Sequence, residues 1–176
     1  GEGGTFQGID QGDTRLDLPT LMELHGQGFI SAIGEGVQIV MASFNSWNGE
    51  KIHGNKMLLT DVLKGQLGFD GFVIGDWKGH GQVEGCSNDS CPHAINAGID
   101  MLMAPKEWES LIRNTLEQVR SGLISESRVD DAVRRILRVK VRAGILERGL
   151  PSRRVAAGRL DVLGSKQHRE VARESV

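Results

Sequence analysis

Asp76 stands in the segment of the chain that is best suited to covalent chemistry. It follows the apolar run at 71–75 (GFVIG) and is followed directly by Trp77. A carboxylate just past the end of a strand can attack the anomeric carbon of a sugar, and a neighbouring aromatic ring can pack on the sugar's apolar face. The alternative is that Asp76 only caps the next turn, because Asp is common after strands.

Three apolar runs, at 38–43, 71–75 and 99–104, must position such side chains. They are nearly continuous rather than alternating, which is typical of strands covered on both faces in a parallel sheet. Strands that alternate with helices and begin about 30 residues apart indicate βαβ units and an α/β fold. In such folds active sites assemble at the C-terminal ends of the strands. The predicted helices span 18–33, 55–67, 108–119 and 125–136.

The number of strands bears on the architecture. Three strands are too few to close an eight-stranded barrel, so the chain is either a small open sheet or a part of a larger barrel. It opens with GEGGTFQGIDQGD, which is neither a start methionine nor a signal peptide, and it stops inside a predicted helix. We expect both ends to be cut from a longer protein, and this favours the barrel.

Charge and hydropathy exclude several classes of function. The 21 Lys and Arg against 23 Asp and Glu give a net charge of -2, which does not favour a nucleic-acid or anionic-membrane partner. Arginines gather between 128 and 159, but Asp130/Arg134 and Asp131/Arg135 stand four residues apart, as on a solvated helix face. The chain has no run of 18 apolar residues, so we predict no membrane span.

The two cysteines, Cys86 and Cys91, enclose the polar loop 87–90 (SNDS). A disulfide across this loop is geometrically feasible and is the interpretation we favour, with free thiols as the alternative. A zinc site would need more ligands than these two and the nearby His93, and there is no second pair. We therefore predict no metal.

Four longer segments carry a resemblance to a known family. VMASFNSWNG, GNKMLLTDVLKGQLGFDGFVIGDW, INAGIDMLM and RVDDAVRRILRVKVRAGIL, in this order and spacing, resemble the β-glucosidases and exo-β-glucan glucohydrolases of glycoside hydrolase family 3. The resemblance covers nearly the whole chain. It implies that Asp76 is the nucleophile of a retaining mechanism, that Trp77 lines the sugar site, and that no cofactor is needed.

The chain departs from this family at several positions of the site. Gly75 stands where members usually have Ser, and Phe44 stands where plant members carry Tyr, so a hydroxyl is missing at each position. The sugar-binding Lys-His pair of the family would lie before Gly1. Glu2 occupies a position where the family commonly has Asp, and it is either a further sugar ligand or a solvated loop residue.

A retaining mechanism also requires an acid/base carboxyl roughly 5 Å from the nucleophile. In two-domain members of the family it comes from the second domain, so we expect it outside this chain, with Glu84 and Asp89 as weak candidates by proximity. Trp47 and His80 are further candidates for contact with substrate. Structural roles are expected for His53, for Asp100 as a buried ion-pair residue, and for Trp108 in the core.

The resemblance also sets the expected domains and function. Residues 1–146 are predicted to form the C-terminal half of a (β/α)8 TIM-type barrel, 147–163 an interdomain linker, and 164–176 the first helix of a second α/β domain. The parent protein is expected to be a secreted or periplasmic exo-acting β-glucosidase that acts on β-glucosides or β-glucan oligosaccharides, and this part alone is expected to be inactive. The alternatives are a non-catalytic carbohydrate-binding or structural fragment, and a β-N-acetylhexosaminidase of the same family.

Overall fold

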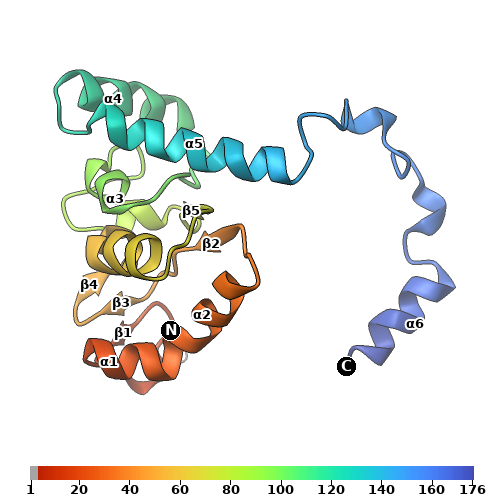
Figure 1. Cartoon of the computed structure of the whole chain (residues 1–176), viewed down its shortest axis with the longest axis horizontal. Coiled ribbons are helices and arrows are strands. Elements are labelled where there is room, and N and C mark those ends of the chain that lie inside the picture. The colour runs from red at the N-terminus through yellow and green to blue at the C-terminus, as the bar shows by residue number, and fades with distance from the viewer. Residues whose placement is uncertain (1–3) are drawn as a thin grey trace. The chain divides into compact units, whose positions relative to one another are not determined.

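The computed structural model describes residues 4–176, which divide into two compact units after Val139 (Figure 1). The first unit contains the strands and the helices that cover them. The second unit begins within α5 and comprises η7 (Pro151–Arg153), η8 (Leu160–Val162) and α6 (Lys166–Glu174). Among the described residues, no helix is long and apolar enough to cross a lipid bilayer. The domain boundaries at 146 and 163 stay predictions.

Two parallel strands form the centre of the first unit. β2 (Ile39–Met41) pairs with β5 (Phe72–Ile74), and a parallel bridge joins Ile74 to Met101. The prediction of parallel strands near 38–43, 71–75 and 99–104 is thereby confirmed. The side chains of Ile39 and Met41 are 47% and 48% exposed, so one face of β2 is open to solvent.

The segment before β2 is helical from residue 18 to residue 34, as predicted. α1 (Leu18–Leu21), η3 (Met22–Gly26) and α2 (Gln27–Gly34) follow one another without a break. The Asp17 carboxylate accepts the Thr20 N–H at 2.8 Å, so Asp17 is the N-cap of α1. The π-type turn of η3 is not visible in the sequence, because one wide turn barely alters the spacing of apolar residues.

The longer helices that follow β2 are η5 (Met57–Gln66), α3 (Pro92–Ala97), α4 (Trp108–Arg120) and α5 (Glu126–Arg142), whose last residues belong to the second unit. The Ser125 hydroxyl accepts the Arg128 N–H at 3.2 Å and so caps the N-terminus of α5. Trp108 is 52% exposed, and its predicted place in the core is wrong. The apolar stripe of α4 is wider than the surface that the described residues cover, and Trp108 lies at its uncovered side, in an apolar groove.

The first unit also contains a small second sheet. β3 (Ser46–Trp47) pairs in parallel with β1 (Asp13–Thr14), which follows η2 (Phe6–Gly8), and antiparallel with β4 (Glu50–Lys51). Asn48 and Gly49 between β3 and β4 have φ angles of 50° and 89°, the conformation that tight two-residue hairpins favour. The Asn-Gly pair is a sequence signal for such a hairpin.

Asp100 is the centre of a buried ion cluster beside β5. Its side chain is 0% exposed and accepts hydrogen bonds from Lys64 at 2.8 Å, from the guanidinium of Arg128, and from the Val73 N–H at 2.8 Å. Burial lowers the pKa of Lys64 to about 8, although the charge of Asp100 acts in the opposite direction. The expectation that Asp100 is a buried ion-pair residue is confirmed, and the cluster ties η5 and α5 to the sheet.

Candidate active site

Asp76 lies two residues beyond β5, at the edge where the parallel strands end, and is half-buried. Its backbone N–H donates to His53 Nε2 at 2.9 Å, and its Oδ1 atom accepts the Trp77 N–H at 2.7 Å. The second contact is a turn-capping hydrogen bond, as expected in the alternative that Asp76 only caps the next turn. It occupies one carboxylate oxygen, and within residues 4–176 no hydrogen bond is made to Oδ2. Capping the turn is therefore compatible with attack by the other oxygen.

The main chain around Asp76 is held from several sides. The Gly75 N–H donates to the Met101 carbonyl at 2.8 Å, and the Gly79 N–H closes a turn onto the Asp76 carbonyl at 2.9 Å. Lys78 has a φ of 57° in this turn, and its N–H donates to the Met103 carbonyl at 3.0 Å. The segment that carries the Asp76 carboxylate is thus hydrogen-bonded to the chain at Met101 and Met103 on one side and to its own turn on the other.

An ion pair stands at the same edge. The Lys78 ammonium donates to Glu107 at 3.0 Å, and this hydrogen bond holds the pKa of the Glu107 carboxyl below its usual range. Glu107 directly precedes α4 and follows the segment 99–104, which was predicted as the third strand. The pair links the turn after β5 to the start of α4.

His53 lies in η4 (Ile52–Gly54) and is 1% exposed. Because Nε2 accepts the Asp76 N–H, the neutral ring carries its proton on Nδ1. Burial lowers the pKa of His53 to about 4, against the attraction of Asp76. The ring of Phe44 lies 6.1 Å from the His53 ring at a tilt of 34°. The structural role expected for His53 is confirmed, while its contact with Asp76 was not foreseen.

The two candidate tryptophans differ in what their rings can offer. Trp77 is 58% exposed and free to present a ring face beside Asp76. Trp47 is half-buried, and its indole N–H donates to the Leu16 carbonyl at 2.8 Å. Trp77 is therefore the one available for stacking on a sugar, whereas Trp47 secures β3 against the segment after β1.

His80, proposed as a substrate contact, is placed elsewhere. It lies in η6 (Gly79–Gln82), is 0% exposed, and its Nε2 atom lies 2.8 Å from the Asn88 carbonyl. Its helical turn carries the side chain inward beneath the loop instead of outward to the site. In the described residues His80 thus has a structural contact, and its contact with substrate stays a prediction.

The loop after the site is closed by a disulfide between Cys86 and Cys91. α4 holds this loop from the other side, since Asn114 donates to the Asp89 carbonyl and Gln118 donates to the Ser90 hydroxyl, each at 2.8 Å. Together with the contact to His80, these bonds make the loop a fixed rim. Disulfide, α4 and η6 therefore restrain the same stretch of chain.

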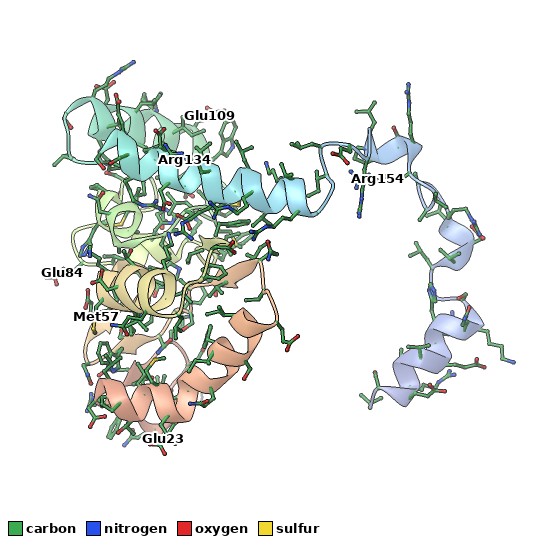
Figure 2. All side chains as sticks on the ribbon, viewed as in Figure 1. Glu23, Met57, Glu84, Glu109, Arg134 and Arg154 are labelled. Carbon is green, nitrogen blue, oxygen red and sulfur yellow. A yellow bond between two sulfur atoms is a disulfide. The ribbon has the colours of Figure 1, made fainter. Side chains whose placement is uncertain are left out.

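The weaker carboxylate candidates do not converge on Asp76. Glu84 is exposed at the outer edge of the first unit in Figure 2. The Asp89 carboxylate accepts the Ser87 hydroxyl at 2.6 Å within its own loop. Glu2 lies outside the described residues. Among residues 4–176 no group of three or more His, Cys, Asp or Glu side chains could hold a metal ion.

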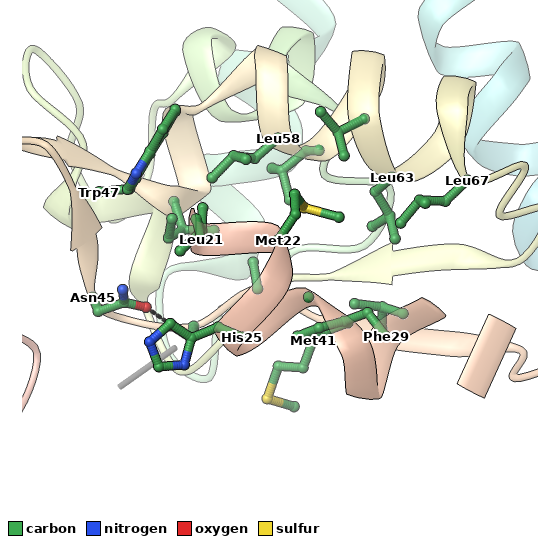
Figure 3. Close-up of a pocket in the computed structure, with 17 residues that line it drawn as sticks. Leu21, Met22, His25, Phe29, Met41, Asn45, Trp47, Leu58, Leu63 and Leu67 are labelled. Carbon is green, nitrogen blue, oxygen red and sulfur yellow. Dashed lines mark hydrogen bonds between the residues drawn. The ribbon is translucent and has the colours of Figure 1, made fainter. Parts of the chain in front are cut away.

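The cavity drawn in Figure 3 is a separate feature. It has a volume of about 140 Å³ and is lined mainly by apolar side chains of α1, η3, α2, β2 and η5. Asp76, Trp77 and Phe44 are not among its lining residues. Sugars require polar partners for their hydroxyls, so we assign the chemistry to the strand edge at Asp76 and not to this apolar cavity.

Comparison with known proteins decides the family. The sequence profile of the glycosyl hydrolase family 3 N-terminal domain matches residues 1–139. The chain belongs to glycosyl hydrolase family 3. It is 34% identical over 151 residues to the lysosomal β-glucosidase of Dictyostelium discoideum, which covers 82% of this chain and 18% of that protein.

Solved structures of family members agree with this assignment. The exo-1,3/1,4-β-glucanase of a Pseudoalteromonas species superposes with a TM-score of 0.95 and 53% identity, over 99% of this chain and 22% of that one. The β-glucosidase of Listeria innocua in complex with glucose gives a TM-score of 0.76 and 28% identity, over 84% and 21%. The family 3 chain thus has the predicted α/β fold and spans less than a quarter of these relatives.

Proposed function

We propose that this family 3 chain is part of a retaining, exo-acting β-glucosidase that removes terminal β-D-glucosyl residues from gluco-oligosaccharides or β-glucans, with Asp76 as nucleophile. The observation that carries the proposal is the Asp76 carboxylate at the end of β5, with its backbone bonded to His53 and the exposed Trp77 beside it. Its relatives, which include β-glucosidases and an exo-1,3/1,4-β-glucanase, support the choice of substrate.

The chemistry follows from the free carboxylate oxygen. Asp76 Oδ2 bonds to the anomeric carbon while the bond to the leaving oxygen breaks, and that oxygen takes the proton of the acid/base carboxyl. Water then attacks the anomeric carbon, gives a proton to the same base and frees Asp76, so the β configuration is retained. The Trp77 ring face supports the sugar during both steps.

We further propose that residues 1–146 are the C-terminal half of the barrel. Ile39 and Met41, both about half exposed on β2, give this part of the sheet an apolar face that the remaining strands would cover. In this proposal 147–163 is the linker and 164–176 opens a second α/β domain that supplies the acid/base. The Cys86–Cys91 disulfide supports a secreted or periplasmic location, because disulfides persist in oxidising compartments.

The test uses a complete enzyme in which residues 1–176 replace the matching segment of the Pseudoalteromonas exo-glucanase, since the two are 53% identical over 99% of this chain. A slow 2-deoxy-2-fluoro-β-glucoside should label the peptide that contains Asp76. Asp76→Asn should lower the rate by about four orders of magnitude or more, and Asp76→Gly should regain activity with azide.

Asp89→Asn is the matched control, because Asp89 lies in the neighbouring loop and its amide replacement can still accept the Ser87 hydroxyl. It should leave the rate within about threefold of the parent. A label on another carboxylate would remove Asp76 from its role. A replaced segment that folds but supports no hydrolysis of any β-glucoside would favour the alternative of a non-catalytic fragment.

A further inference from the structure

We infer that His53 is a positioning residue: it sets the place of the nucleophile by holding the main chain of Asp76 across the ends of two neighbouring strands. The inference rests on the proposed role of Asp76. It assigns no chemical step to the imidazole, which contacts the backbone and not the carboxylate of the nucleophile.

The first observation is the bridge that the ring makes. Ser43 follows β2 and Asp76 follows β5, and the two strands are adjacent and parallel. His53 accepts the Asp76 N–H at 2.9 Å through Nε2. Its ring also lies 6.1 Å from the ring of Phe44, which follows β2, and the Ser43 backbone favours its protonation. A single buried imidazole therefore spans both strand ends. Only the neutral ring with its proton on Nδ1 can accept the Asp76 N–H at Nε2.

The second observation is how tightly the turn after Asp76 encloses the ring. A Cβ atom placed on Gly79 would lie 2.2 Å from His53 Nε2, whereas one on Gly75 would lie 3.4 Å from His53 Cδ2. The backbone at Gly79 thus rests against the imidazole itself. Phe44, a candidate for the sugar site, tilts against the same ring at 6.1 Å. A change in the ring would move the nucleophile, its turn and Phe44 together.

The effect on catalysis follows from geometry and charge. Displacement of a reacting group by about 1 Å can reduce a rate about 100-fold without loss of substrate binding. Protonation of the ring would replace the acceptor at Nε2 by a second donor, pointed at the Asp76 N–H. The charged groups that act on His53 are Asp76, which favours protonation, and His80 and Lys51, which oppose it. Burial lowers the pKa of the ring to about 4 and so keeps it neutral at pH values well above 4.

The experiment compares His53→Phe, His53→Gln and His53→Asn in the complete enzyme described above. Phe keeps the ring but offers no acceptor, Gln places an amide oxygen near Nε2, and Asn is one methylene too short. We expect His53→Phe to lower kcat and the rate of labelling by the 2-fluoroglucoside by about 10- to 100-fold with KM changed less than threefold. His53→Gln should recover at least about half of that loss on a logarithmic scale, and His53→Asn should not.

Ile124→Ala is the stability control, since Ile124 is 0% exposed in the turn between α4 and α5 and does not contact the site. It should lower the melting temperature and leave kcat unchanged below that temperature. His53 has no positioning role if kcat of the histidine variants falls only at temperatures where they begin to unfold. The same holds if His53→Gln recovers no more activity than His53→Asn. Should His53→Phe fail to fold, the contrast between Gln and Asn decides alone. Absence of label at Asp76 in the parent would instead refute the proposed function.

Discussion

Replacement of Asp100 by Asn tests how strongly the buried ion cluster supports the sheet. The change is nearly isosteric, but it removes the negative charge that faces Lys64 and Arg128, whose side chains are only 6% and 14% exposed. Loss of one partner from a buried pair costs about 3–5 kcal/mol. This is a large part of the roughly 5–15 kcal/mol that stabilises a typical domain. Lys64 and Arg128 then keep Asp131, which is 42% exposed, as their carboxylate partner at 4.0 and 2.9 Å.

Asp130→Asn is the matched control on the same helix. The Asp130–Arg134 pair is 62% and 66% exposed, and such surface pairs contribute about 1 kcal/mol or less. Scanning calorimetry of the complete enzyme at one scan rate should therefore separate the two variants. The melting temperature should fall at least about three times as far for Asp100→Asn as for Asp130→Asn, since the expected free-energy losses differ by about that factor. Equal shifts for the two variants would refute the assignment of this cluster as a structural anchor.

Three further predictions concern the site and its rim. The pKa of His53 is lowered from 6.5 to about 4, so the stability that the neutral ring contributes to the fold is complete above pH 6.5 and is lost as pH falls towards 4. Melting measured as a function of pH should therefore show a loss of about 3 kcal/mol over this range, and His53→Gln should lose less. Gly79→Ala should reduce kcat by about tenfold or more, whereas Gly75→Ser should stay within about threefold, when both are assayed with an aryl β-glucoside. Replacing Cys86 and Cys91 by Ser should lower the free energy of unfolding by about 2 kcal/mol, measured by thermal unfolding, and a reductant should lower the stability of the parent enzyme by the same amount.

The strands and most helices could be predicted from sequence because their signals are local. The runs 38–43 and 71–75 are apolar throughout, and the Asp17 cap marks the start of the first helix within one residue. Trp108 could not be placed by the same reasoning. Its helical spacing identifies an apolar stripe, but spacing does not reveal how much of that stripe is covered.

The candidate site was predictable only where chemistry and position coincide in one segment. Asp76 and Trp77 follow a strand, and this order alone places them at the active edge of a parallel sheet. His53 and His80 looked alike in sequence, as single histidines in loops. Only the tertiary structure shows that one contacts the nucleophile's backbone and the other the Asn88 carbonyl.

The contact between Gly79 and the His53 ring has a consequence for evolution. A side chain at position 79 and an imidazole at position 53 cannot occupy the same space, because the added carbon would stand 2.2 Å from Nε2. The two positions should therefore covary: a family member that retains His at 53 is confined to Gly at 79, and a larger residue at 79 requires a smaller one at 53. Position 75, where the added atom meets ordinary contacts of 3.4 Å or more, is free to drift between Gly and Ser by comparison.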